Sequence, residues 1–346
     1  MITLHQVECP KCHGQLNSTN PLSGQYACPF CCTVFHITAN MTIQAEMPEQ
    51  IIPFTISEKD FEKVAWQKLI EEKYAPENIS GLIEFENIRG FYLPVFLYDG
   101  QYECSWSCKV KQIPENTDTT NTQKSIYSLQ NGVSKSGYTF VCPAYNGVES
   151  SNELAEYICS LKCKSSDLKS FHSDDLSGYF FLPGNRNSSE VWNQWGEKTL
   201  DSIARTNTLT QLQSSDIKEF NCTVSSGSSH EGKYVFFPVW MIRYQYNNKL
   251  HHIYMDGTGV NDIKGTELVD DTLKARVEKP FMILKFISVI AIVIPLLMML
   301  ASWYIPAIIA LVALWLVFFG YRFYARWHKD RVISNARKKR EKALIS

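Results

Sequence analysis

Four cysteines near the N-terminus have the spacing of a metal site. Cys9 and Cys12 are separated by two residues, as are Cys28 and Cys31, and 15 residues lie between the pairs. Such a short spacing lets a tight turn aim two thiolates at one ion, and two pairs complete the sulfur tetrahedron that Zn²⁺ accepts. Because all four ligands are thiolates, no position stays open for water, and the predicted zinc site is structural.

Alternatives to this zinc site stay open on the sequence. The cysteines could be free or joined in two disulfides, and iron also accepts four thiolates. Cys32, His13 and His36 lie close enough in sequence to compete as ligands. We expect reduced cysteines, because residues 1–9 lack the basic and apolar regions of a signal peptide.

The remaining cysteines are expected to be small buried residues. Cys159 and Cys163 would share one face of a helix, a placement that could suit a metal, and Cys104 and Cys108 would share one face of a strand. The full set is Cys104, Cys108, Cys142, Cys159, Cys163 and Cys222.

The titratable residues of the body form no spaced catalytic group. His251 and His252 would lie on opposite faces of a strand, so they would not share a metal. The sequence also lacks the G-x-x-x-x-G-K-S/T motif of nucleotide-driven motors. We therefore expect that the chain is not an enzyme, and the residues leave open whether it binds a small-molecule substrate.

The elements that would position these residues predict an α+β fold. Residues 1–40 would form a zinc ribbon, followed by a linker over 41–56. Residues 57–270 would form a mixed, β-rich cytosolic domain with a few helices. A two-helix transmembrane hairpin would cover 281–321, and residues 322–346 would form a basic cytosolic tail.

Periodicity and turn residues predict the elements of the body. Ser57, with Asp60 three residues on, caps a helix. Further helices are expected over 152–163 and 190–204, and a polar loop over 114–130. Strands are expected over 82–85, 91–106, 236–246 and 250–255, the last two joined across Asn247-Asn248. Residues 91–96 and 235–240 resemble each other, each with a proline at the fourth position. The match could record two related β-units, and it could equally be chance between apolar strands.

The membrane hairpin is predicted from apolarity. Residues 286–321 contain no Asp, Glu, Lys or Arg. As one helix these residues would extend ~54 Å, whereas a bilayer core is ~30 Å thick. We therefore expect two spans, 281–300 and 304–321, with Trp303 and Tyr304 at the interface.

Charge indicates the orientation of these spans. Residues 322–346 carry nine Lys or Arg and two acids, a net charge of +7, while the rest of the chain is acidic. Positive flanks stay in the cytosol, so both termini are predicted to be cytosolic at the cytoplasmic (inner) membrane. The distal cluster 337–340 is expected to meet anionic lipid or an acidic partner. The acidic body argues against a broad nucleic-acid surface.

Several short motifs resemble a bacterial family. The paired cysteines are followed by Ile52-Pro53-Phe54, the segments 74–77, 90–96, 177–179 and 237–240, and Asp256-Gly257-Thr258-Gly259 before the apolar stretch. In this order they are similar to TFIIB-type zinc-ribbon-containing membrane proteins, which bear labels such as helicase-like or replisome organiser. The chain departs from the family pattern at Cys32 and in the long polar loop.

The resemblance implies a function in recruitment. Some members of the family are associated with membrane-stress systems and recruit flotillin-like scaffold proteins. The chain is thus expected to be a membrane-anchored, zinc-binding adaptor, with the lipid bilayer and a scaffold-type protein as partners. A nucleic-acid-binding ribbon tethered to the membrane is the alternative, but residues 1–40 contain one Lys and no Arg.

Overall fold

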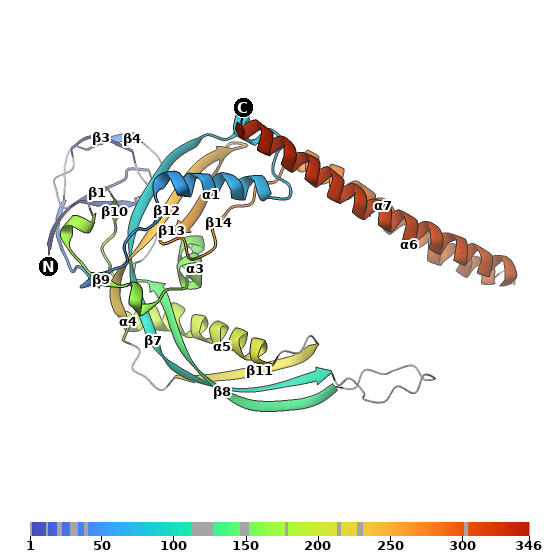
Figure 1. Cartoon of the computed structure of the whole chain (residues 1–346), viewed down its shortest axis with the longest axis horizontal. Helices are drawn as coiled ribbons and strands as arrows, with labels where there is room; N and C mark the ends of the chain where they lie inside the picture. Colours follow the sequence, from blue (N-terminus) through green and yellow to red (C-terminus); the bar gives the residue numbers. More distant parts are fainter. Residues whose placement is uncertain are drawn as a thin grey trace. The chain divides into compact units, whose positions relative to one another are not determined.

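The structure is a computed structural model of the whole chain (Figure 1). It divides into two compact units. The first comprises residues 1–58, 87–241 and 254–264, and the second comprises residues 59–86, 242–253 and 265–346. The residues described are 2–11, 13–18, 23–27, 34–37, 41–111, 127–145, 152–176, 179–212, 216–226, 231–300 and 304–345.

The first unit is built on an antiparallel-rich sheet around the long strand β7 (Phe85–Lys111). The strand β8 (Tyr127–Pro143) pairs with β7 along its length, and β11 (Ile217–Ser226) pairs with β7 over 102–110. The strand β12 (Lys233–Tyr246) also neighbours β7, and β13 (Lys249–Asp256) follows β12. Residues 242–253 of these two strands and their turn belong to the second unit. The polar loop predicted over 114–130 is therefore shorter, because 127–130 belong to β8; residues 112–126 lie outside the described ranges.

Short strands extend this sheet to the N-terminus. The strands β1 (Ile2–Glu8), β2 (Gln15–Ser18) and β5 (Met41–Ala45) are antiparallel neighbours. Phe181 of β10 (Phe180–Phe181) pairs with Asn17 of β2 and joins them to β7. The smaller strands are β3 (Gly24–Ala27), β4 (Val34–Ile37), β6 (Gln50–Ile51) and β9 (Lys169–Ser170).

Helices cover parts of this sheet. The helix α3 (Asn152–Ser160) ends before Cys163, so the predicted helix is shorter than expected. The helix predicted over 190–204 is confirmed as α4 (Ser188–Val191), a π-helical turn (Trp192–Gly196) and α5 (Glu197–Gln211). Short 3₁₀ turns cover Ser165–Asp167 and Ser173–Leu176.

The two similar runs, 91–96 and 235–240, lie in the same core of this unit. Leu93 and Val95 of β7 share one buried cluster with Phe237 and Val239 of β12, at equivalent positions around the two prolines. Tyr92 and Phe236 share a second cluster, which also contains Leu4 of β1. Alternate side chains point to opposite faces of a strand, so the two runs divide their residues between the same two clusters.

The second unit contains α1 (Glu58–Glu71), α2 (Ile79–Leu82), β14 (Lys264–Gly265), α6 (Asp271–Leu300) and α7 (Tyr304–Ile345). The helix predicted after Ser57 is confirmed as α1, which buries Phe61, Ala65 and Leu69 on one face. The hairpin predicted across Asn247-Asn248 is also confirmed, because both residues have positive φ values of 51° and 58°, as a type I′ turn requires. The helices α6 and α7 run side by side (Figure 1).

The prediction that residues 281–300 and 304–321 form transmembrane spans is wrong. Across the described parts of α6 and α7, no helix is long and apolar enough to cross a membrane. The segments 281–300 and 304–321 belong to longer helices whose other turns carry charged residues, including Asp271 and Arg276 in α6 and the basic residues after 321 in α7. The predicted two-span location at the inner membrane is overturned by the same finding.

Candidate functional site

The N-terminal cysteines are described in part. Cys9 directly follows β1 and is fully buried. Its amide donates to the carbonyl of Gly14 at 3.0 Å, and its carbonyl accepts from the amide of His13 at 2.9 Å, so the chain turns tightly here. Cys12, Cys28 and Cys31 lie outside the described residues, as does Cys32. The four-cysteine zinc site therefore stays a prediction.

The fold predicted for this region is corrected. Within the described ranges, no group of three or more His, Cys, Asp or Glu side chains is placed to hold a metal ion. The predicted fold, a zinc ribbon joined to a transmembrane hairpin, is thus overturned, and the described residues form a mixed α/β architecture. This finding does not test zinc binding by the four cysteines, because three of them lie outside the described residues. The physical reason lies in the packing, because Leu4 is fully buried with Tyr92 and Phe236 in a shared apolar core.

An aromatic face lies exposed along α7. We define it as Trp315, Phe319, Phe323 and Trp327, whose exposed fractions are 46%, 53%, 76% and 49%. Residues four apart lie on the same side of a helix, so the four rings follow one another over roughly 18 Å. The rings of Trp315 and Phe319 are in contact, with centroids 5.4 Å apart. A contiguous exposed apolar patch of this kind often marks a site where another molecule binds.

Basic side chains border the aromatic face. Arg322 and Arg326 immediately precede Phe323 and Trp327 and are exposed. Arg331 lies over the Trp327 ring at 5.0 Å, a cation–π contact. This part of α7 therefore combines exposed aromatic rings with positive charge.

The distal basic cluster makes contacts within the chain, whereas an external anionic lipid or acidic partner stays a prediction. Arg340 is fully buried and donates from Nη1 to the carbonyls of Glu72 at 2.7 Å and Ala75 at 3.1 Å. Burial lowers the pKa of the Arg340 guanidinium. Arg337 and Lys339 form ion pairs with Glu71 and Glu77. The C-terminal turns of α7 are thus fastened to the segment that follows α1.

The two histidines of β13 lie in different surroundings, as predicted. His251 stacks on the Tyr244 ring with centroids 5.3 Å apart. His252 accepts from Arg243 Nε through Nε2 at 3.1 Å. Burial, reinforced by the Arg243 charge, lowers the pKa of His252 to about 4. An imidazole that accepts from arginine is neutral, so this pair has a structural role.

The body cysteines are grouped differently from the expectation. Cys163 lies beyond the end of α3 and packs against another cluster than Cys159. Cys159 instead approaches Cys142 of β8, with 3.8 Å between the sulfur atoms. Nothing in the spacing of Cys142 and Cys159 indicated this contact, because it depends on how α3 packs on the sheet. Cys104 and Cys108 are both buried in β7, as expected.

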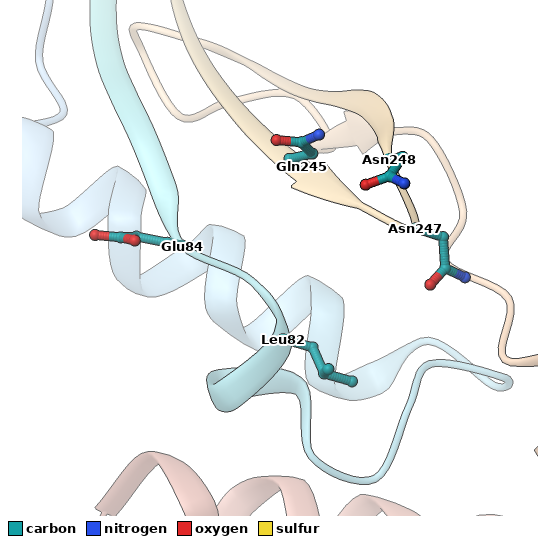
Figure 2. A pocket seen from close by; sticks show the side chains of 5 residues that line it. All are labelled: Leu82, Glu84, Gln245, Asn247 and Asn248. Carbon is teal, nitrogen blue, oxygen red and sulfur yellow. The ribbon is translucent and has the colours of Figure 1, made fainter.

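An open hollow of about 680 Å³ lies at the tip of the β12–β13 hairpin. Figure 2 shows its lining: Gln245, Asn247 and Asn248 on the hairpin, with Leu82 at the end of α2 and Glu84 between α2 and β7. All five side chains are exposed. The two asparagines suit the positive φ values of the turn, so their presence is explained by conformation alone.

Comparison with known proteins identifies one distant relative. No protein-family model matches the chain. The chain is 22% identical over 215 residues to "Uncharacterized protein YdjG" of Bacillus subtilis (strain 168), an alignment that covers 61% of each protein. The chain thus spans less than two thirds of that relative's length. No solved structure matches.

Proposed function

We propose that this chain is an adaptor without enzymatic activity, which uses the aromatic face of α7 to bind a protein partner that presents an acidic amphipathic helix. The single observation that carries the proposal is the exposure of Trp315, Phe319, Phe323 and Trp327 at successive four-residue spacings along α7. Recruitment of a scaffold-type partner, which the family resemblance implies, is compatible with this surface.

The chemistry of the surface indicates the kind of partner. Aromatic side chains supply large apolar contact area at low entropic cost, and such residues dominate binding energy at interfaces. A line of rings at helical spacing fits the apolar stripe of a second helix. Arg322 and Arg326 beside the rings favour a partner with Asp or Glu along its edge.

The distal basic cluster already makes contacts within the chain. Arg337, Lys339 and Arg340 already contact Glu71, Glu77 and the carbonyl of Glu72. These three side chains therefore stabilise the chain itself, and binding should depend on the proximal arginines.

The proposal can be tested with two synthetic helices that share the same leucine positions. One carries Glu at all polar positions and the other carries Lys. We expect the purified full-length chain to bind the acidic helix, measured by fluorescence anisotropy, and binding should weaken as salt is raised. The basic helix should not bind.

Paired variants locate the interface. Phe323→Ala with Trp327→Ala should weaken binding at least about tenfold, and Arg322→Glu with Arg326→Glu should remove the preference for the acidic helix. The matched control is Leu129→Ala with Val133→Ala, because these residues of β8 are also exposed, at 70% and 58%. The control should bind normally.

Three outcomes would overturn the proposal. Equal binding of both helices would deny the charge preference. Self-association that is lost in the aromatic variant would make a second copy of the chain the occupant. Retention by phosphatidylcholine vesicles, lost in the same variant, would indicate a lipid occupant.

A further inference from the structure

Two thiols from different elements of the first unit lie in contact. Cys142 is in β8, opposite Phe96 of β7, and is fully buried. Cys159 is in the last turn of α3 and is partly exposed. Their sulfur atoms are 3.8 Å apart, and a disulfide would need them to approach to about 2.05 Å. Formation of a disulfide therefore requires the two side chains and the end of α3 to move by this difference.

The two thiols differ in character. The hydrogen bond between them lowers the pKa of Cys159 and raises the pKa of Cys142, so Cys159 is the first of the two to lose its proton. The Thr199 hydroxyl adds to the effect at Cys159. A thiolate is the reactive form of cysteine, so Cys159 is the nucleophile of the pair.

Cys159 is also the accessible member of the pair. It lines a hollow of about 710 Å³ between α3, β8 and α5, together with Tyr138, Trp195 and Thr199. A small oxidant can enter such a hollow and reach Cys159, whereas Cys142 lies behind it. Cys159 is therefore both the more reactive and the more accessible of the two thiols, and Cys142 lies beside it as a second thiol.

We propose that Cys142 and Cys159 form a peroxide-sensitive dithiol that closes to a disulfide and ties α3 to β8. The Cys159 thiolate attacks one oxygen of hydrogen peroxide, the O–O bond breaks, and the hydroxide released takes up a proton to form water. Cys159 is now a sulfenic acid. The sulfur of Cys142 then attacks the sulfur of Cys159, the S–O bond breaks, and a second water leaves with the Cys142 proton.

This scheme balances without another reactant. Two thiols lose two electrons and two protons, and hydrogen peroxide is reduced to two molecules of water. The assignment is independent of the proposed adaptor function, because all of its residues belong to the first unit and the aromatic face belongs to the second.

Two other cysteines of the chain, Cys163 and Cys222, serve as internal references for the reactivity of Cys159. Burial, with a smaller contribution from Asp167, raises the pKa of Cys163 to about 12. Burial and the neighbouring Cys104 raise the pKa of Cys222. These cysteines should react slowly with peroxide and with alkylating reagents, even though Cys163 lies only four residues from Cys159.

The first measurement uses the unaltered chain. Iodoacetamide at neutral pH should modify Cys159 at least about tenfold faster than Cys163, as followed by peptide mass spectrometry. After treatment with hydrogen peroxide, a linked peptide containing Cys142 and Cys159 should appear and should be lost on reduction. Equal alkylation rates, or oxidised protein without this link, would overturn the assignment.

Variants then separate the two roles. In Cys142→Ser, peroxide should leave a sulfenic acid on Cys159 that dimedone traps. In Cys159→Ser, Cys142 should stay reduced, and in the matched control Cys163→Ser the link should form as in the unaltered chain. Dimedone labelling of Cys142 in the Cys159→Ser variant would contradict the assigned order of attack. Loss of the Cys142–Cys159 link in the Cys163→Ser control would contradict it as well.

Discussion

Arg340 Nη1 lies 2.7 Å from the carbonyl oxygen of Glu72 and donates a hydrogen bond to it. The guanidinium is fully buried at this point, 268 residues along the chain from its acceptor. The contact shows that the basic C-terminal segment of α7 is part of the folded second unit, fastened to the residues after α1.

Replacing Arg340 should destabilise the second unit. Arg340→Ala removes the donors to the carbonyls of Glu72 and Ala75, which then stay buried without these bonds. We expect a loss of about 3 kcal/mol in the free energy of unfolding, measured in urea, with faster hydrogen exchange in the last turns of α7. The exposed neighbour is the control: Lys338→Ala should change stability by less than about 0.5 kcal/mol.

Protonation of His252 at acidic pH should lower the free energy of unfolding, because this residue of the β12–β13 hairpin is neutral in the fold. Its pKa is lowered from the ordinary histidine value of 6.5 to about 4 in the fold, so the unfolded chain binds more protons between these values. The contribution of neutral His252 to the free energy of unfolding is fully present above pH 6.5, and it is lost as the pH falls toward about 4. Its size should be on the order of 2 kcal/mol.

A difference measurement isolates this effect from the titration of carboxylates. His252→Gln keeps an acceptor for Arg243 but cannot be protonated, so its unfolding free energy should fall less between pH 6.5 and 4.5. His172→Gln, at an exposed position, serves as the control and should follow the unaltered chain. Parallel curves for all three proteins would refute the role assigned to His252.

The Asp256 carboxylate should hold the turn that follows β13. It is fully buried and accepts from the amides of Thr258 at 2.6 Å and Asn261 at 2.7 Å, and from the Thr258 hydroxyl. Asp256→Asn replaces one acceptor oxygen by a donor and should cost about 2–3 kcal/mol in urea unfolding. Asp262→Ala removes an exposed carboxylate in the same turn and should be nearly neutral.

Zinc content remains a direct test of the N-terminal cysteines. We expect about one zinc per purified chain, held by Cys9, Cys12, Cys28 and Cys31. Elemental analysis of Cys9→Ser and Cys28→Ser should show the loss of this zinc, whereas Cys108→Ser, a buried cysteine of β7, should retain it. If both N-terminal variants kept the full zinc content, the assignment of these four cysteines as zinc ligands would be wrong.

Local features of the chain could be predicted from sequence, because their causes are local. The helix after Ser57 follows from apolar residues at helical spacing, and α1 buries Phe61, Ala65 and Leu69 accordingly. The hairpin at Asn247-Asn248 follows from two residues that tolerate positive φ. The different surroundings of His251 and His252 follow from the two-residue period of a strand.

The arrangement of distant segments was decided by tertiary packing. Apolarity over 286–321 predicted two membrane spans, but it does not specify where a helix ends, and α7 continues through its charged turns to Ile345. Residues 1–40 were expected to fold around a metal, yet Leu4 is buried in a core formed with Tyr92 and Phe236. The contact between Cys142 and Cys159 exists because α3 packs on β8, and the burial of Arg340 exists because α7 returns to α1. Each depends on the free energy of burying surfaces from separate segments, which spacing along one segment does not encode.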